Sequence, residues 1–166
     1  MEGLYRAKHK NGTWVDGFYA NRQDTVYCFK EDYERHPVVK HHYILQDCMT
    51  DWGLPNELRT IPIDPSTLCR FTGKFDRNYK PIYEHDIVRI RGNQSVPDWK
   101  DVDYIAQIVF LDGGFCAIDG TEEEHGFRRY ALARRDFDLE VLGNIHDSPE
   151  LLAEDKDDYS SHSQFM

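Results

Sequence analysis

The chain has 166 residues and carries 20 Lys and Arg against 30 Asp and Glu, a formal net charge of −10. This length corresponds to one domain, or to one domain with a small companion. No apolar run approaches the roughly 20 residues that cross a bilayer, which excludes a membrane-spanning protein, and a supply of 10 Tyr, 9 Phe and 3 Trp argues against a disordered chain.

The first third of the chain predicts short strands with a little helix. Asn11-Gly12 separates two aromatic-bearing segments, 4–8 and 13–19, and this dipeptide predicts a β-hairpin because both residues tolerate a positive φ. Further strands are expected at 25–29 and 38–46, with one helical turn at 30–35 that ends before Pro37. Residues 47–56 fit either a short helix or a loop, because Gly53 and Pro55 interrupt them.

The rest of the chain predicts a second β-rich part. Pro62 and Pro65 bracket a connecting segment, so we place the boundary between an N-terminal β-rich region, 1–64, and a second domain, 65–152. The expected strands lie at 67–72, 86–91, 104–111, 115–118, 126–133 and 139–142, with a short helix at 148–152. Five or so short strands at this spacing predict a mainly β fold with a small SH3-like barrel in the C-terminal half. The charged residues 153–166 predict a flexible acidic tail.

The four cysteines indicate a reducing compartment. Cys28, Cys48, Cys69 and Cys116 form no C-x-x-C pair, which excludes the usual spacing of a structural zinc site. The N-terminus also lacks the pattern of a signal peptide. We therefore expect reduced thiols in the cytoplasm of the cell, with no metal and no cofactor.

The net charge is unevenly distributed along the chain. Residues 67–100 hold seven Lys and Arg against four Asp and Glu, a net of +3, whereas the residues after 100 carry −11. Cations and aromatic rings alternate in the basic stretch 70–91, a mixture suited to phosphate and base contacts. The candidate nucleic-acid or partner-binding residues are Arg70, Lys74, Arg77, Lys80, Tyr83, Arg89 and Arg91. The alternative is that these cations occupy only the solvent face of strands, and the overall negative charge disfavours nucleic acid.

Two sequence blocks resemble the YopX family of small proteins from phages and prophages. The first block reads PSTLCRFTG at 65–73, DRN at 76–78 and IYEHDIV at 82–88, and the second reads EVLGNIHDSPELL at 140–152. The resemblance extends from residue 4 to 152 and implies an SH3-like β domain, an association with mobile phage DNA, a tendency to form homo-oligomers and no established biochemical activity.

This chain departs from the family pattern at two glycines, which are replaced by Tyr79 and His85. Glycine at such places usually supplies a positive φ or a close backbone approach. A tyrosine adopts the left-handed region only at a cost, so we expect the turn at Tyr79 to differ in type or length. Histidine tolerates this region better.

Catalytic and metal sites have weaker support in the sequence. His36, His41 and His42 lie close together, but neighbouring residues of a strand point to opposite faces, so His41 and His42 cannot bind the same ion. The acidic run 122–125 fits a solvated loop, and no nucleotide-binding or nucleophile motif is present. We therefore expect a protein that is not an enzyme.

The aromatic content exceeds what a small barrel can bury, and exposed rings tend to mark interfaces. Our leading hypothesis is a non-enzymatic phage accessory protein, self-associating and acting on an unidentified phage or host protein, whose anionic surface favours a basic partner. The alternative is a nucleic-acid-binding regulatory module that uses residues 70–91.

Overall fold

The structure is a computed structural model of the whole chain and describes residues 4–92, 103–119, 128–132 and 137–152. Of the described residues, 58% are strand and 9% are helix, which confirms the mainly β class. The chain divides into two compact units, Met1–Arg70 and Phe71–Met166. The division falls inside one strand, a few residues later than the boundary expected from the prolines. Within the described ranges, no helix has the length and apolar character needed to cross a membrane.

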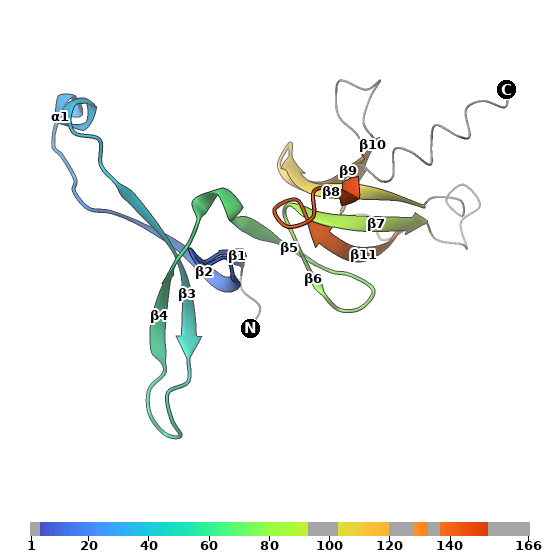
Figure 1. Cartoon of the computed structure of the whole chain (residues 1–166), viewed down its shortest axis with the longest axis horizontal. Helices are drawn as coiled ribbons and strands as arrows, with labels where there is room; N and C mark the ends of the chain where they lie inside the picture. Colours follow the sequence, from blue (N-terminus) through green and yellow to red (C-terminus); the bar gives the residue numbers. More distant parts are fainter. Residues whose placement is uncertain (1–3, 93–102, 120–127, 133–136, 153–166) are drawn as a thin grey trace. The chain divides into compact units, whose positions relative to one another are not determined.

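The first unit is an antiparallel sheet with one short helix (Figure 1). Its elements are β1 (Tyr5–Lys8), β2 (Trp14–Gln23), α1 (Lys30–Arg35), β3 (Lys40–Cys48), β4 (Glu57–Pro62) and the 3₁₀ turn Pro65–Thr67. The strand order is β4-β3-β2-β1, so β4 lies at the edge of the sheet. The fully buried core of this unit is small and consists of Ala7, Ile44 and Ile63, against which Tyr5, Val15, Tyr19 and Leu68 pack.

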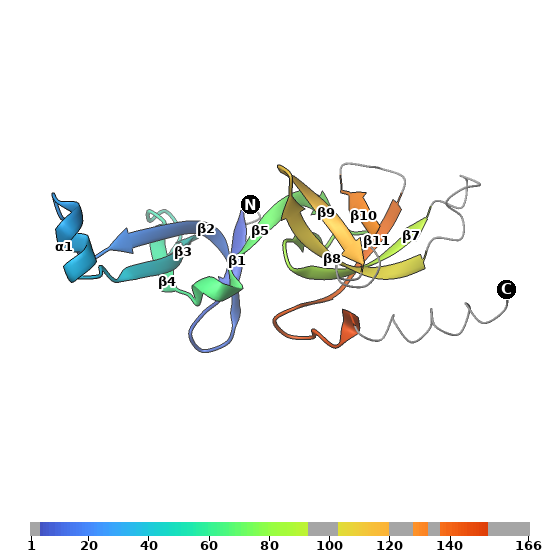
Figure 2. The same ribbon diagram turned by 90° about the horizontal axis from the view of Figure 1, so that it is seen from above.

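The second unit is a curved antiparallel sheet (Figure 2). β5 (Cys69–Phe75) pairs first with β1 and then with β6 (Pro81–Tyr83). The five-stranded sheet is built from β7 (Asp86–Gly92), β8 (Asp103–Leu111), β9 (Gly114–Asp119), β10 (Arg128–Ala131) and β11 (Phe137–Asn144). Its order is β10-β9-β8-β7-β11, and within the described residues β10 and β11 do not pair, so no closed barrel forms there.

Alternating apolar positions of the central strands form the core of the second unit. Val88 and Ile90 of β7 lie opposite Ala106 and Tyr104 of β8, and all four are buried. Their even spacing places them on one side of the sheet, as the strand period of two requires. The intervening Arg89 and Arg91 consequently point to the opposite, solvent-facing side.

Several predicted elements are confirmed and three differ, one of which is β6, a strand that was not predicted. The hairpin at Asn11-Gly12 and the helix at 30–35 are present, with φ +90° at Gly12. Residues 25–29 were expected to form a strand, but they belong to the connection that carries α1, where the backbone N–H of Tyr27 donates to the hydroxyl of Tyr33. β4 was not predicted. The predicted tail, 153–166, and the acidic run, 122–125, lie outside the described residues.

The turn between β5 and β6 also differs from the expectation. Tyr79 adopts a φ of +60° and His85 a φ of +68°, so both keep the left-handed backbone that the family pattern assigns to glycine. The turn is held by Asp76, whose Oδ1 accepts hydrogen bonds from the backbone N–H groups of Asn78 and Lys80 at 2.7 and 2.9 Å. These bonds fix the backbone on both sides of Tyr79, so the turn retains its conformation at the expense of strain at that residue.

Replacing Tyr79 by glycine is expected to leave the free energy of unfolding unchanged or to raise it by up to about 1.6 kcal/mol. The left-handed region costs a non-glycine residue roughly 1–2 kcal/mol, and glycine's greater freedom in the unfolded chain offsets roughly 0.4–1 kcal/mol of that gain. Little packing is lost, because Tyr79 is 88% exposed. Urea denaturation of both proteins measures the difference, and a clear loss of stability in Tyr79→Gly would contradict this explanation of the turn.

Candidate functional site

Three arginines of the basic stretch are paired with carboxylates across neighbouring strands. Arg89 donates from Nε and Nη2 to the two carboxylate oxygens of Asp103 on β8, at 2.6 and 2.8 Å. Arg91 Nη1 lies 3.4 Å from Oε2 of Glu140 on β11, and Arg77 Nη2 lies 3.5 Å from the same oxygen. Hydrogen bonding from Arg89 holds the pKa of Asp103 below its usual value, although partial burial opposes this.

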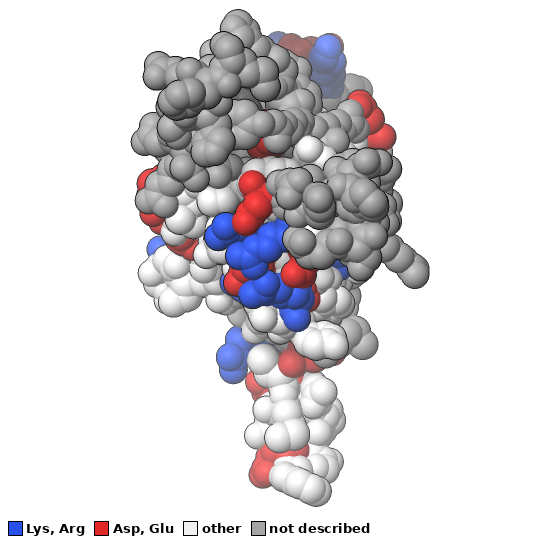
Figure 3. Space-filling model, turned by 90° about the vertical axis from the view of Figure 1, so that its right-hand side faces the viewer, with Lys and Arg blue, Asp and Glu red and all other residues white. Residues whose placement is uncertain are grey.

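These ion pairs neutralise much of the positive charge of Arg77, Arg89 and Arg91. Figure 3 shows Lys and Arg side chains gathered at the centre of one face, with acidic side chains directly beside them. Exposed pairs of this kind contribute little to stability, about 0–1 kcal/mol each. Their main effect is that phosphate must compete with carboxylates already in place, which weakens the case for this surface as a nucleic-acid site.

The other four candidate residues occupy different environments. Arg70 and Lys74 are half-buried on β5, and Lys80 is exposed in the turn that Asp76 organises. Tyr83 is buried, and its ring centroid lies 5.5 Å from that of Phe71. Its ring therefore packs inside the protein and does not offer an exposed surface for stacking on a base.

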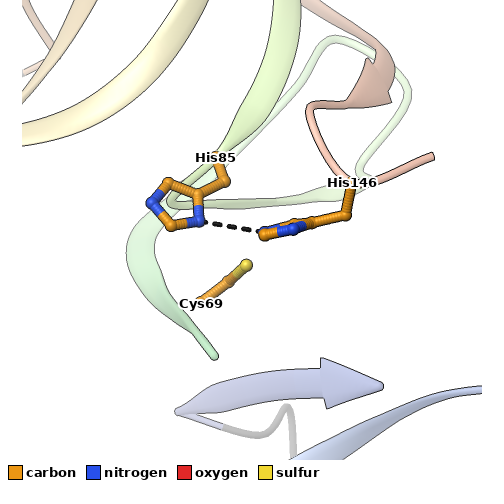
Figure 4. A group of neighbouring side chains, drawn as sticks. All are labelled: Cys69, His85 and His146. Carbon is orange, nitrogen blue, oxygen red and sulfur yellow. Dashed lines mark hydrogen bonds between the residues drawn. The ribbon is translucent and has the colours of Figure 1, made fainter. Parts of the chain in front are cut away.

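A second group of side chains, Cys69, His85 and His146, brings three potential metal ligands together (Figure 4). One ligand atom from each lies within 4.8 Å of the others, and Nδ1 of His85 is 3.1 Å from Nε2 of His146. Cys69 is fully buried and the two histidines are half-buried. We call these three residues the Cys-His-His cluster.

Cys69 belongs to the first unit, and His85 and His146 belong to the second. β5 and β6 pair at Phe71 and Tyr83. His85 is in the turn between β6 and β7, where its backbone N–H donates to Ile108 and its carbonyl accepts from Ile145, at 2.8 and 3.0 Å. Both bonds fix the backbone of His85, so the direction of its side chain is set by the sheet.

His146 is held by the turn that follows β11. The side-chain oxygen of Asn144 accepts hydrogen bonds from the backbone N–H groups of His146 and Asp147, at 3.0 and 3.1 Å, and Asn144 Nδ2 donates to Asp147 at 2.9 Å. Asn144 is itself buried. This Asx-type turn fixes the backbone at His146.

Sequence spacing does not reveal this cluster, because its members are 16 and 61 positions apart. The histidines that the sequence did single out have other contacts. His41 lies 2.9 Å from Asp24, and His42 lies 2.6 Å from the hydroxyl of Tyr19.

The third feature is apolar surface at the end of the β3–β4 hairpin. We call Met49, Trp52, Leu54 and Leu58 the hairpin tip, and all four are more than half exposed, with Trp52 at 92%. Leu58 lies on β4, whose first four residues, Glu57 to Thr60, are all exposed. An edge strand with adjacent apolar groups is the arrangement that invites pairing with another strand.

Comparison with known proteins identifies the family. The family model described as YopX protein matches residues 4–153. The chain belongs to the YopX family. A solved structure similar to this YopX-family chain is the X-ray crystal structure of protein yopX from Bacillus subtilis, with 18% sequence identity, coverage of 91% of this chain and 98% of that chain, and a TM-score of 0.48. No match is found among curated proteins.

Proposed function

We propose that this YopX-family chain is a non-enzymatic phage or prophage accessory protein that self-associates in the host cytoplasm through the β3–β4 hairpin. The observation that carries the proposal is the exposed edge strand β4 beside the apolar hairpin tip. The occupant of this surface is a second copy of the chain. Binding, rather than a chemical step, is the activity assigned to it.

The sequence of β4 is complementary to itself in antiparallel pairing. A register centred on Leu58 places Leu58 opposite Leu58 of the second copy. The same register places Glu57 opposite Arg59 of the second copy, and Arg59 opposite its Glu57. Opposite charges and apolar pairs at facing positions each contribute roughly 0.2–1 kcal/mol. Backbone hydrogen bonding along the edge adds the affinity that strand addition provides.

The small core of the first unit supports the same proposal. Its cluster of fully buried residues has three members, whereas the second unit's has eight. Small domains bury a lower fraction of their surface and gain stability from association. Burying the hairpin tip between two copies would remove from water the indole of Trp52 and the side chains of Met49 and Leu54.

A single substitution at the centre of the register tests the proposal. Leu58→Lys places two lysines opposite each other and is expected to weaken association by at least tenfold, as measured by light scattering after gel filtration. The control is Tyr79→Gly, which removes an exposed apolar side chain from the second unit and is expected to leave the mass unchanged. Equal association of Leu58→Lys and the natural chain would contradict the proposed interface.

Nucleic-acid binding through residues 70–91 is the weaker proposal, because Arg77, Arg89 and Arg91 lie beside their own carboxylates. A gel shift at low salt separates the two proposals. A shift that disappears in Arg89→Gln would favour the nucleic-acid module, whereas a shift that persists unchanged would not support these arginines as its site.

A further inference from the structure

We propose that one face of the first unit's sheet binds single-stranded nucleic acid. We call it the outer face, meaning the side of β1–β4 that points away from the small core of this unit. Its residues used below are Arg6, Lys8, Trp14, Phe18, Arg22 and Tyr43. The inference goes beyond the proposed self-association and is independent of it, because that association uses the edge of β4. It is also distinct from the candidate residues of the basic stretch, which lie on β5 and beyond.

The strand register determines which side chains share the outer face. Val15 and Tyr19 of β2 pack against the core, so Trp14, Phe18 and Arg22 of the same strand point to the other side (Figure 1). Residues paired across neighbouring strands share a face. The pairs on the outer face include Lys8 with Trp14, Arg6 with Asp16, and Tyr43 with Ala20.

Two cations gather around Trp14 at one end of the outer face. The Trp14 ring centroid lies 4.9 Å from Cζ of Arg6 and 5.5 Å from Nζ of Lys8. Contacts of this kind restrict both long side chains, so less conformational entropy is lost when they bind a phosphate. Arg22 is exposed eight residues further along β2, which is about 26 Å at the usual strand rise. At roughly 3.4 Å per stacked nucleotide, this span covers up to about eight nucleotides.

Aromatic rings occupy the surface between these cations. Phe18 lies midway between Trp14 and Arg22 on β2 and is 46% exposed. Tyr43 of β3 is half-buried and lies diagonally across from Phe18, opposite the small side chain of Ala20. Every base has a flat face that can stack on an exposed ring, whereas the bases of a duplex are stacked on each other. Rings flanked by cations therefore favour a single strand.

The charge of the first unit does not oppose a phosphate-bearing ligand. Residues 1–70 hold nine Lys and Arg against ten Asp and Glu, so nearly all of the chain's net charge of −10 lies in the second unit. Within β1–β4, the outer face carries three Lys and Arg against two carboxylates, Asp16 and Asp47. Asp16 is exposed beside Arg6, so its charge should weaken the binding of phosphate there.

The primary test is the fluorescence anisotropy of a labelled oligothymidine of about 12 nucleotides, titrated with the whole chain at low salt. Phe18→Ala should weaken binding by about 5- to 150-fold, the range for losing one base–ring stack. Lys8→Gln should lower the slope of log affinity against log salt by about 0.7, the value for one phosphate contact.

Matched controls are Phe29→Ala, which removes a 67% exposed ring outside β1–β4, and Lys40→Gln, which removes an exposed cation from the other side of β3. Both should bind as the natural chain does. No binding by the natural chain, or equal binding by all four variants, would overturn the proposal.

Two further variants and a competitor exclude a folding artefact and a nonspecific polyanion site. Asp16→Asn removes a carboxylate from the outer face and should tighten binding about two- to fivefold, a gain that misfolding does not produce. Phe18→Tyr keeps a ring and should bind as the natural chain does. Polyglutamate of similar length has no rings to stack, so it should compete at least about tenfold less well. Unchanged binding by Asp16→Asn, loss of binding in Phe18→Tyr, or equal competition by polyglutamate would contradict the proposed site.

Discussion

Replacement of Asp76 by alanine is expected to lower the free energy of unfolding by about 2–4 kcal/mol. The Asp76 carboxylate accepts three backbone hydrogen bonds, from Asn78 and Lys80 in its own turn and from Val141 on β11 at 3.1 Å. Bonds to a charged acceptor contribute roughly 1.5–3 kcal/mol each. Asn78 and Lys80 are exposed and recover a bond to water, whereas the link to β11 is lost altogether.

The charge of Asp76 also gives this contribution a pH dependence. Burial by itself would raise the pKa of Asp76, but the backbone N–H groups of Lys80, Val141 and Asn78 outweigh burial and hold the pKa below 3.8. A carboxyl whose pKa is depressed by folding stabilises the protein above its unfolded-state pKa. That contribution is lost as the pH falls below 3.8 and through the folded-state pKa.

Urea denaturation near pH 7 and near pH 3 measures both effects. Asp76→Asn keeps one accepting oxygen but no charge, so we expect a smaller loss of about 1–2 kcal/mol near pH 7 and a weaker acid dependence than in the natural chain. A loss below about 0.5 kcal/mol in Asp76→Ala would show that the turn does not depend on this carboxylate.

Replacement of Ile44 by alanine is expected to cost the first unit about 2–5 kcal/mol, the range for truncating a buried isoleucine. Ile44 is fully buried between Ala7 and Ile63 in the three-residue core of that unit. Gly17 of β2 gives it room, since a Cβ at that glycine would lie 2.8 Å from Ile44 Cγ2. With so small a core, the first unit has few other contacts to compensate for the loss.

We expect the two units to unfold in separate thermal transitions, so the loss of stability in the first unit can be measured on its own. Thermal unfolding of Ile44→Ala should show an early transition, whereas Ile108→Ala, in the core of the second unit, should leave the first unit's transition unchanged. Ile44→Val, expected to cost 0.5–1.5 kcal/mol, is the conservative control. If association stabilises the first unit, its transition temperature rises with protein concentration. A cost below about 1 kcal/mol for Ile44→Ala would show that this core is not what holds the unit together.

Local patterns predicted the class of the fold and many of its strands, but not the elements that depend on neighbours. Residues 25–29 have strand-like composition and still form a connection, since β2 pairs directly with β3 and no edge remains there for them. β4 was not predicted because Glu57 to Thr60 are all exposed. These residues therefore lack the alternation of buried and exposed positions that marks a half-buried strand. An edge strand is defined by its pairing with β3, which no local pattern encodes.

In the candidate sites, too, local patterns predicted the residue types but not the contacts with residues far away in the sequence. Arg77, Arg89 and Arg91 were correctly recognised as a concentration of positive charge, but their carboxylate partners come from β8 and β11, more than ten residues away in sequence. The turn at Tyr79 was expected to change with the loss of glycine, whereas Tyr79 has a left-handed φ of +60° and two hydrogen bonds to Asp76 hold the backbone on either side of it.

The most direct test of self-association through β4 is a charge-swap series measured by sedimentation equilibrium. The proposed register pairs Glu57 with Arg59 of the second copy, so Glu57→Arg or Arg59→Glu alone places like charges opposite each other twice. Each single variant should weaken association by about tenfold, while the double swap restores the natural constant. A natural chain that stays at 19.6 kDa at every concentration, or single and double variants that associate alike, would contradict the proposed interface.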